Sequence, residues 1–270
     1  MKLSLRLVGP IGSDTAGPDG ISAKLIDKAH RSRMLECLGL LWNQLWCNGK
    51  FVSVWKKEDR VVIPEPGKKD YHESAAYRTV AITSMVGKRF EHITARRLTQ
   101  VLDELQFDPL QFAYLRNRST TEAILLLTEL IKKPIIKGYK TGAVFFDFSD
   151  AFGSVDRTCL VYKIGHHFNI FGRLLLHINS FLSDRFARIR FNGENGPWIE
   201  SEWGTSAGTK LGPLLFIMYL YLRDIPKSIF PKFADDVVSV TSGICCKEIE
   251  KSLQVSERAV GLGKRLGDGA

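Results

Sequence analysis

The segments GAVFFDF (residues 142–148) and KFADDVVSV (residues 232–240) are apolar runs that carry carboxylates in unusual places. Both have the length and composition of β-strands, so we expect two strands packed into a core. Asp147 lies near the end of the first run, and Asp235 and Asp236 interrupt the second. Because Asp is almost never fully buried unless it is paired or bound to something, these three carboxylates predict a functional site.

The Asp235–Asp236 pair predicts a hairpin. Adjacent strand residues point to opposite faces of a sheet, so both side chains approach one point only if a tight turn falls at Ala234-Asp235-Asp236. If Asp147 ends a neighbouring strand, two or three carboxylates converge. At roughly 4 Å, two such charges repel by about 4 kcal/mol at an intermediate dielectric. Either one of them then takes a proton or a divalent cation neutralises them.

The types of ligand available favour one class of cation. Oxygen ligands without a nearby His or Cys favour Mg²⁺ over Zn²⁺. Two such ions about 3.5–4 Å apart would suit in-line phosphoryl transfer. The alternative is an ordinary pair of acids that caps a helix or meets Arg and Lys, and for any single Asp this alternative is the more common one. The presence of carboxylates in both apolar strands favours the metal site.

The rest of the chain predicts a mixture of helices and strands. Apolar residues at helical spacing predict helices at 24–46, 88–104, 119–132, 157–168, 173–182, 209–222 and from about 246 onward. Ser119 and Glu122 suit the start of one helix, as a capping hydroxyl and an early acid. Further strands are expected at 60–63, 187–191 and 198–203, the last two as an antiparallel hairpin. Interleaving without strict β-α alternation predicts the α+β class.

The composition is that of a globular protein with a basic bias. The 270 residues include 44% hydrophobic and 25% charged residues. Lys and Arg number 38 against 29 Asp and Glu, and the resulting net charge of +9 favours a polyanionic partner such as nucleic acid. Five scattered cysteines without metal-ligand spacing suit a reducing compartment. The longest apolar stretch, residues 211–222, is too short for a membrane span, so secreted, membrane-embedded and fibrous classes are set aside.

Ordered sequence blocks resemble a known family. FFDFSDAFGSVD (145–156), GTSAGTKLGPLLF (204–216) and FADD (233–236) resemble the A, B and C motifs of reverse transcriptases, with non-LTR (LINE-type) retrotransposons as the nearest class. Earlier blocks agree in order: TAGPDGI (15–21), VVIPEPGKKD (61–70), YRTVAITS (77–84), KRFEHITARRL (88–98) and QFAYLRNRSTTEAI (111–124). FADD alone is weak evidence, whereas the ordered set covers most of the chain.

The resemblance implies roles for the carboxylates. Asp147 and Asp235 correspond to the metal-binding pair, Phe148 lends its backbone carbonyl, and Asp236 completes the acidic turn. The implied cofactor is Mg²⁺ as two ions, or Mn²⁺ in its place. The implied reaction transfers a nucleotide from a dNTP to a primer 3′-hydroxyl without a covalent intermediate.

The resemblance also implies substrate contacts. Phe152 stands where a bulky side chain excludes a ribose 2′-hydroxyl, although an ordinary core phenylalanine would look the same in sequence. Arg78, assisted by Lys68, corresponds to the arginine that holds the incoming triphosphate. Ala207 and Gly208 lie where the backbone approaches the nascent base pair.

Three further cations are expected to meet template or primer phosphates: Arg116, Arg118 and Lys210. A solvated basic face is the alternative for these residues. Several positions also depart from the family pattern. Ser206 replaces a usual proline, Ala207 a glutamine, Lys210 a small apolar residue, Asp150 a lysine, Gly153 an aspartate, Glu65 a lysine and Leu115 an arginine. The metal ligands are retained while the substrate-orienting set is altered.

The implied architecture is a right-hand polymerase with fingers and palm and without a thumb. We expect an N-terminal extension at 1–14, fingers at 15–130, palm at 131–244 and a truncated C-terminal helix at 245–270, within one reverse transcriptase domain of about 47–270. The predicted function is RNA-directed DNA polymerase, with RNA template, DNA primer and dNTP as partners and no membrane. The alternatives are an inactive nucleic-acid-binding remnant and an unstable pseudogene product. By ancestry, the expected location is the nucleus or a cytoplasmic ribonucleoprotein, and the sequence does not indicate the oligomeric state.

Overall fold

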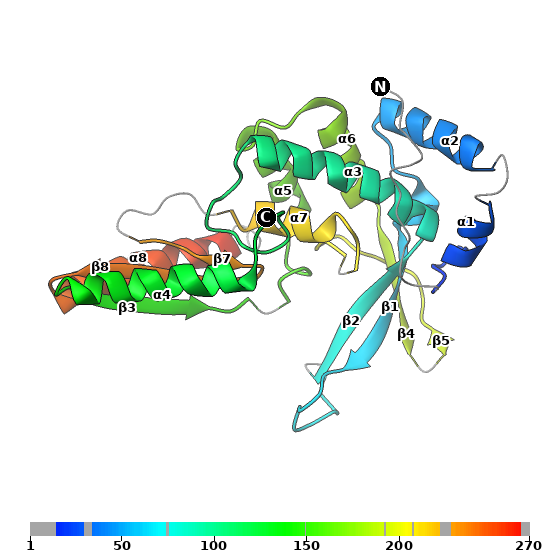
Figure 1. Ribbon diagram of the computed structural model, residues 1–270. Helices are drawn as coiled ribbons and strands as arrows, with labels where there is room; N and C mark the ends of the chain where they lie inside the picture. The colour runs from blue at the N-terminus through cyan, green and yellow to red at the C-terminus, as the bar shows by residue number, and fades with distance from the viewer. Residues whose placement is uncertain are drawn as a thin grey trace.

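Two β-sheets lie on either side of a group of helices in the computed structural model (Figure 1). The structure describes residues 15–29, 34–73, 76–148, 150–191, 193–206, 208–221 and 228–265. Helices and strands are interleaved without regular alternation, which confirms the predicted α+β class.

The larger sheet has five strands and forms one arm of the molecule. Its strands are β1 (Lys57–Pro64), β2 (Tyr77–Thr83), β4 (Phe186–Phe191), β5 (Glu194–Asn195) and β6 (Ile199–Glu200). β1 pairs antiparallel with β2 and parallel with β4, and β4 pairs antiparallel with β5 and β6. The predicted strand at 60–63 and the hairpin at 187–203 are confirmed, although the returning strand is split into two pieces. β2 was not among the predicted strands.

The smaller sheet is built from the two carboxylate-bearing segments. β3 (Lys140–Phe146) pairs antiparallel with β8 (Asp236–Gly243), which pairs in turn with β7 (Lys232–Phe233). The two predicted strands are therefore confirmed and are direct neighbours. The first of them is less buried than expected: no residue of β3 is fully buried and Phe145 is 69% exposed, although half-buried Phe146 packs against the core.

Two helices flank this smaller sheet, α4 (Thr120–Ile136) and α8 (Cys246–Arg265). A Cβ added at Gly142 would lie 2.6 Å from Ile249, so α8 packs directly against β3. On the other face, Ile124 of α4 shares a cavity of about 340 Å³ with Phe145 and Val238. This cavity explains why Phe145 remains exposed: α4 covers its side of the sheet incompletely.

The remaining helices are α1 (Ala23–Ala29), α2 (Met34–Asn48), η2 (Ser53–Lys56), α3 (Met85–Glu104), α5 (Arg157–His166), α6 (Gly172–Leu182) and α7 (Gly212–Tyr219). α3, α4, α5, α6 and α8 agree with the predicted helices to within a few residues. Ser119 and Glu122 form a capping box at the start of α4, as expected. α1 and α2 occupy the range of the single helix predicted at 24–46 and extend slightly beyond it, and residues 30–33 between them lie outside the described part. α7 begins three residues later than predicted.

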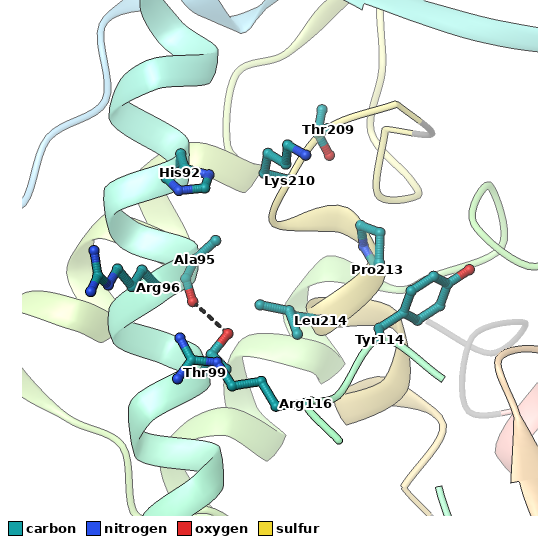
Figure 2. A pocket seen from close by; sticks show the side chains of 10 residues that line it. All are labelled: His92, Ala95, Arg96, Thr99, Tyr114, Arg116, Thr209, Lys210, Pro213 and Leu214. Atoms are coloured by element: carbon teal, nitrogen blue, oxygen red, sulfur yellow. Dashed lines mark hydrogen bonds between the residues drawn. The ribbon is translucent and has the colours of Figure 1, made fainter. Parts of the chain in front are cut away.

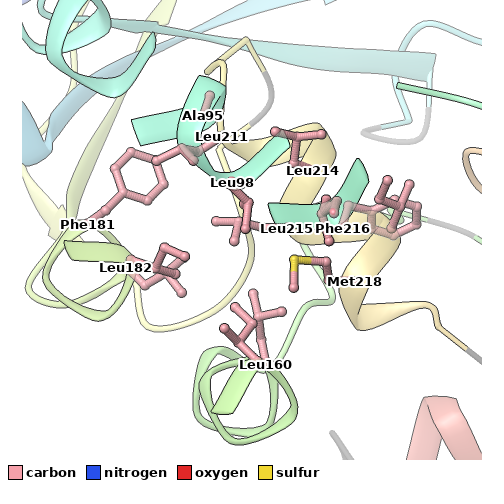
Figure 3. Close-up of a cluster of buried hydrophobic side chains, with 14 of the residues drawn as sticks. Ala95, Leu98, Leu160, Phe181, Leu182, Leu211, Leu214, Leu215, Phe216 and Met218 are labelled. Carbon is pink, nitrogen blue, oxygen red and sulfur yellow. The ribbon is translucent and has the colours of Figure 1, made fainter. Parts of the chain in front are cut away.

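The main hydrophobic core is centred on α7. Leu215 and Met218 of this helix are completely buried. Figure 3 shows that Leu98 of α3, Leu160 of α5 and Leu182 of α6 gather around them. Each fully buried leucine contributes roughly 1.5–3 kcal/mol to folding, so this contact holds the segment after the GTSAGTK loop firmly in place. Among the described residues, no helix is both long and apolar enough to cross a membrane.

Candidate active site

The β7–β8 hairpin carries the FADD segment at its tip. Phe233 pairs with Asp236, so Ala234 and Asp235 form the loop between the two strands. Ala234 has φ +56°, a left-handed conformation that is typical of tight two-residue hairpins. The predicted turn at Ala234-Asp235-Asp236 is therefore confirmed. Asp235 is half-buried and Asp236 is exposed.

Asp147 follows β3 directly and lies beside this hairpin. The last register pair of the two strands sets Phe146 opposite Val237. One residue further along, Asp147 stands level with Asp236, and opposite residues of neighbouring antiparallel strands have Cα atoms about 4.5–5.5 Å apart. Asp147 and Asp236 also line the same cavity. Strand pairing thus brings carboxylates from two distant segments to one end of the smaller sheet.

The three carboxylates have no basic partner among the residues that the structure describes. Within the described ranges, no Lys, Arg or His forms an ion pair with Asp147, Asp235 or Asp236. Pairing with basic side chains therefore does not explain why acids occupy these positions.

The three carboxylates do not form a closed metal cage. In the part of the chain that the structure describes, no three His, Cys, Asp or Glu side chains are grouped so that they could hold a metal ion. Mg²⁺ does not require such a group, because it is usually bound through one or two carboxylates, with water and substrate phosphates completing its shell. Asp147, Asp235 and the Phe148 carbonyl are oxygen ligands of the type that this cation prefers, and their convergence on one ion stays a prediction.

A basic pocket of about 600 Å³ lies between α3, the loop after α3 and the loop before α7 (Figure 2). His92 and Arg96 of α3 line it together with Arg116 and Lys210, and none of its described lining residues is acidic. Burial and then the positive charges of Lys210, Arg96 and Arg89 lower the pKa of His92. A concave surface with this potential attracts phosphate groups.

Tyr114 connects the basic pocket to the hairpin. Its side chain lines the pocket close to Pro213 (Figure 2). Burial raises the pKa of the Tyr114 hydroxyl, and the negative charge of Asp235 raises it further. The Asp235 carboxylate therefore lies near enough to Tyr114 to act on it electrostatically. The basic pocket therefore adjoins the Asp235 end of the hairpin.

The three predicted phosphate contacts have different environments. Arg116 and Lys210 line the basic pocket. Arg118 instead donates hydrogen bonds to three backbone carbonyl oxygens of the loop after α3, those of Phe107, Asp108 and Gln111. Its guanidinium braces this loop, so we expect Arg118 to contribute less to phosphate binding than the other two.

The loop that leads into α7 runs against β2. Gly208 has φ +99°, and a Cβ at this position would lie 2.9 Å from the Ala81 carbonyl oxygen. Both the backbone conformation and the close packing therefore require glycine. The close contact that requires glycine at position 208 is with β2. The approach of Gly208 to a nascent base pair stays a prediction. Ala207 lies outside the described residues.

A buried carboxylate holds the first part of this loop. Glu58 of β1 is 1% exposed, forms ion pairs of 2.9 Å with both Arg185 and Arg60, and accepts a hydrogen bond from the Ser206 hydroxyl. Burial alone would raise the pKa of Glu58, but Arg185, Ser206 and Arg60 together bring it below its usual value. Ser206, which departs from the family pattern, thus supplies a hydrogen bond that a proline could not donate.

Arg157 of α5 supports the segment just before Ser206. Its guanidinium donates hydrogen bonds to the carbonyl oxygens of Gly204 and Trp203, each at 2.8 Å, and to that of Ser201. Burial and the neighbouring charge of Arg185 lower the pKa of Arg157 to about 10. The Arg157 guanidinium therefore remains charged at neutral pH and satisfies these carbonyl oxygens as hydrogen-bond acceptors.

A second buried carboxylate holds the other end of the same loop. Glu91 of α3 is 2% exposed and accepts a 2.6 Å hydrogen bond from the Leu211 N–H. Burial raises the pKa of Glu91 to about 7, against the opposing effects of the Lys210 and Leu211 amides and of the Arg185 and Lys88 charges. The two ends of the loop are thus fixed by Glu58 and Glu91 while its middle remains next to the pocket.

Phe152 is half-buried at the edge of the core. Its ring lies 5.0 Å from that of Phe216, with a tilt of 38°. This packing agrees with a core phenylalanine, and the role of Phe152 in excluding a 2′-hydroxyl stays a prediction. Asp150 and Gly153, which both differ from the family pattern, are in contact. A Cβ added at Gly153 would collide with a carboxylate oxygen of Asp150. Asp150 therefore occupies the space that a side chain at position 153 would need.

Arg78 and Lys68 are carried by the β1–β2 hairpin. Arg78 is exposed and pairs with Ile63 in the sheet register, and Lys68 lies in the connecting loop and forms a 3.0 Å ion pair with Glu65. The hairpin projects downward from the helical centre in the view of Figure 1. The contact of these two residues with a triphosphate stays a prediction.

Sequence reasoning missed several residues of this site. Glu91 could have been recognised, because Gly87, Ala95 and Leu98 at helical spacing place it on the apolar face of α3. Glu58 and Gln111 gave no such signal, because their partners lie far away in sequence. His92 and Arg96 look in sequence like ordinary surface residues of a helix.

Comparison with known proteins identifies the family. Residues 63–261 match the family model described as reverse transcriptase (RNA-dependent DNA polymerase). The chain is 28% identical over 239 residues to a probable RNA-directed DNA polymerase from transposon BS of Drosophila melanogaster, covering 84% of this chain and 26% of that protein. It is 27% identical over 234 residues to the RNA-directed DNA polymerase from mobile element jockey of the same organism, covering 86% and 25%.

A third relative and a solved structure agree. The Pol polyprotein of type-1 retrotransposable element R1 from Bradysia coprophila is 25% identical over 226 residues, which cover 82% of this chain and 22% of that protein. The fold is similar to that of apo telomerase from Candida tropicalis truncated from its C-terminal domain, with a TM-score of 0.52 and 13% identity over 86% of this chain and 58% of the other. The chain spans about a quarter of the length of these curated relatives.

The matching blocks, the right-hand polymerase fold and the family match agree with one another. The chain belongs to the reverse transcriptase (RNA-dependent DNA polymerase) family, as a domain of the non-LTR, LINE type.

Proposed function

We propose that this chain carries the catalytic site of RNA-directed DNA synthesis, in which a primer 3′-hydroxyl attacks the α-phosphorus of a dNTP on an RNA template. One observation carries the proposal. Asp147 and the Asp235–Asp236 pair lie at one end of the smaller sheet without a basic partner among the described residues, and Asp235 lies near Tyr114 of the basic pocket. This combination suits a reaction between phosphate groups.

Asp147, Asp235 and the Phe148 carbonyl are the groups that would hold Mg²⁺, or Mn²⁺ in its place. When bound, divalent ions would supply charge neutralisation and activation of the attacking hydroxyl. The chain itself provides the acidic ligands, with Asp236 beside them at the start of β8. Asp147 directly follows β3, and Asp235 lies in the loop of the hairpin that pairs with β3, so strand pairing brings the two segments to the same end of the sheet.

The basic pocket would bind the sugar–phosphate backbone of the template and primer. The pocket is lined by Arg116, Lys210, His92 and Arg96. Tyr114 also lines it and is close enough to Asp235 to feel its charge. Cations that neutralise phosphates also release counterions from the nucleic acid, which gives binding a steep dependence on salt.

Nucleotide selection is assigned to residues around this centre. Arg78 and Lys68 would hold the triphosphate, Phe152 would exclude the 2′-hydroxyl, and Ala207 and Gly208 would face the nascent base pair. In this assignment, residues 15–130 form fingers and 131–244 a palm. The strands β4 to β6 belong to the 131–244 segment but pair into the same sheet as β1 and β2 of the 15–130 segment.

Primer extension tests the proposed function. The purified chain is given an RNA template, an annealed DNA primer, dNTPs and Mg²⁺, and extension is compared with that of Asp235→Asn. We expect extension by the unmodified chain and a loss of at least a thousandfold in the variant. Asp103→Asn, at an exposed position of α3, is the matched control and should extend normally.

The basic pocket also supports an alternative function, binding of nucleic acid without catalysis. The pocket does not depend on the carboxylates, and Ala207 stands where the resemblance implies a glutamine. Salt-sensitive binding of the template–primer duplex together with no extension by the unmodified chain would establish this alternative and exclude the enzyme.

A further inference from the structure

The loop after α3 is joined to the β7–β8 hairpin by a buried side chain. Gln111 is 1% exposed, and its side-chain oxygen accepts hydrogen bonds from the N–H of Ala113 at 3.0 Å and from the N–H of Ala234 at 3.2 Å. Ala234 lies 123 residues further along the chain and directly precedes Asp235. One amide oxygen therefore connects the loop after α3 with the tip that presents the predicted metal ligand.

The residue held by this bond has an unfavourable backbone conformation. Ala234 has φ +56° and is 7% exposed. A non-glycine residue in the left-handed region is strained and persists only where the surroundings fix it. A hydrogen bond to its N–H from a rigid, buried acceptor is such a restraint, and it acts one residue before Asp235.

The acceptor is itself held rigidly. Phe112 N–H donates to the Lys232 carbonyl and Lys232 N–H donates to the Leu110 carbonyl, both at 2.8 Å, so the loop runs alongside β7. Lys232 and Asp108 form a buried ion pair of 2.8 Å at the base of the hairpin. Arg118 braces the loop through its hydrogen bonds to backbone carbonyls.

We propose that Gln111 is a positioning residue: by fixing Ala234 in the left-handed conformation it sets the direction in which the Asp235 carboxylate leaves the hairpin. This role rests on the proposed function, in which Asp235 holds a divalent cation. Gln111 does not contact substrate or metal in this account, and it acts only through the backbone of Ala234. The loop would thereby couple the basic pocket, which Tyr114 and Arg116 line, to the geometry of the acidic tip.

The test removes the acceptor and restores it. Gln111→Leu removes the oxygen, Gln111→Asn shortens the side chain and serves if the leucine variant does not fold, and Gln111→Glu keeps an acceptor at the same distance. We expect hydrogen exchange of the Ala234 amide to accelerate by about fivefold or more in the first two variants and to return toward normal in the third. We also expect kcat for primer extension to fall by about 10- to 100-fold, the Mg²⁺ requirement to rise, and the KM for dNTP to change little.

Leu160→Ala is the control for general destabilisation. Leu160 is completely buried in the core beside α7, and its replacement leaves the Gln111 oxygen and the bonds of its loop in place. A lower melting temperature with normal Ala234 exchange and an unchanged Mg²⁺ requirement is expected, which separates general destabilisation from positioning.

Two results would overturn the proposal. One is unchanged exchange of the Ala234 amide in the variants that lack the acceptor, and the other is faster exchange with unaltered kcat and Mg²⁺ requirement. If the unmodified chain extends no primer, the proposed function fails separately, and exchange at Ala234 alone then decides whether Gln111 restrains the tip.

Discussion

Glu91 is an ionisable group in an almost fully buried position, hydrogen-bonded to the loop that leads into α7. Burial raises the pKa of Glu91 to about 7 in the folded chain, whereas its ordinary value is 4.5. Between these values the folded state binds more protons than the unfolded state. The stabilising contribution of Glu91 is therefore fully present below about pH 4.5 and is lost as pH rises through about 7.

Glu91→Gln should remove this pH dependence while keeping an oxygen that can accept from the Leu211 N–H. Urea unfolding of both proteins at pH 5 and pH 8 measures the difference in the free energy of unfolding. We expect the variant to gain stability relative to the unmodified chain on going to pH 8, by up to about 3 kcal/mol. A difference that stays constant with pH would contradict the assignment.

His177 makes stability depend on pH in the opposite direction. The test therefore compares the free energy of unfolding of Glu91→Gln with that of the unmodified chain at each pH. Burial lowers the pKa of His177 to about 4, and its ring is stacked on that of Trp46 at 4.6 Å. Its contribution to stability is present above about pH 6.5 and is lost as pH falls toward 4. His177 is present in both proteins, so its effect cancels when Glu91→Gln is compared with the unmodified chain.

Gly208→Ala should destabilise the chain because the added Cβ would meet the Ala81 carbonyl at 2.9 Å in addition to its unfavourable φ. Gly138→Ala is the matched control: its φ is +83°, but nothing lies within 4 Å of the added atom. We expect a loss of about 2–4 kcal/mol for the first and about 1 kcal/mol for the second, measured by urea unfolding. Equal losses would show that the approach to β2 carries no additional cost.

At the scale of elements, the basic pocket joins α3 to two loops. Arg116→Ala and Lys210→Ala should each weaken binding of an RNA–DNA duplex by about three- to tenfold and reduce the slope of log K against log salt by about 1. Fluorescence anisotropy at several salt concentrations measures both quantities. Lys132→Ala, at an exposed position on α4, is the control and should change neither. A slope that is equally steep in all three variants would argue against phosphate contacts in the pocket.

Most of the individual helices and strands could be predicted from the sequence because their patterns are local. The hairpin tip at Ala234–Asp235 follows from a pair of acids between two apolar runs, and the start of α4 from Ser119 and Glu122. The burial of Phe145 was predicted wrongly from the local pattern, because the sequence of an apolar strand does not reveal how completely a neighbouring helix covers it. The local pattern also placed the start of α7 too early, since Thr209 and Lys210 belong to the loop that Glu91 and Ser206 hold.

The contacts that shape the site could not be predicted because they are long-range. Glu58 and Ser206 are 148 residues apart, and Gln111 and Ala234 are 123 apart. The parallel pairing of β1 with β4 joins equally distant segments. Periodicity carries no information on such pairs. The carboxylates could be found in sequence only because each departs from the apolar pattern around it.

At the scale of the whole molecule, the predicted site draws on both sheets. Asp147 and the β7–β8 hairpin lie at one end of the smaller sheet, whereas Arg78 and Lys68 are carried by the β1–β2 hairpin of the larger sheet. If both groups contact one nucleotide, as proposed, the catalytic centre is shared between the two sheets. The triphosphate contacts of Arg78 and Lys68 stay a prediction.

The central claim is that β3 and the β7–β8 hairpin contribute to one catalytic centre, and single-turnover primer extension by Asp147→Asn tests it most directly. Binding of the template–primer duplex is measured in parallel, to show that the variant is folded and has bound its substrate. The account predicts a rate at least a thousandfold below that of the unmodified chain, comparable to that of Asp235→Asn, with duplex binding retained. An extension rate for Asp147→Asn within tenfold of the unmodified chain would contradict it.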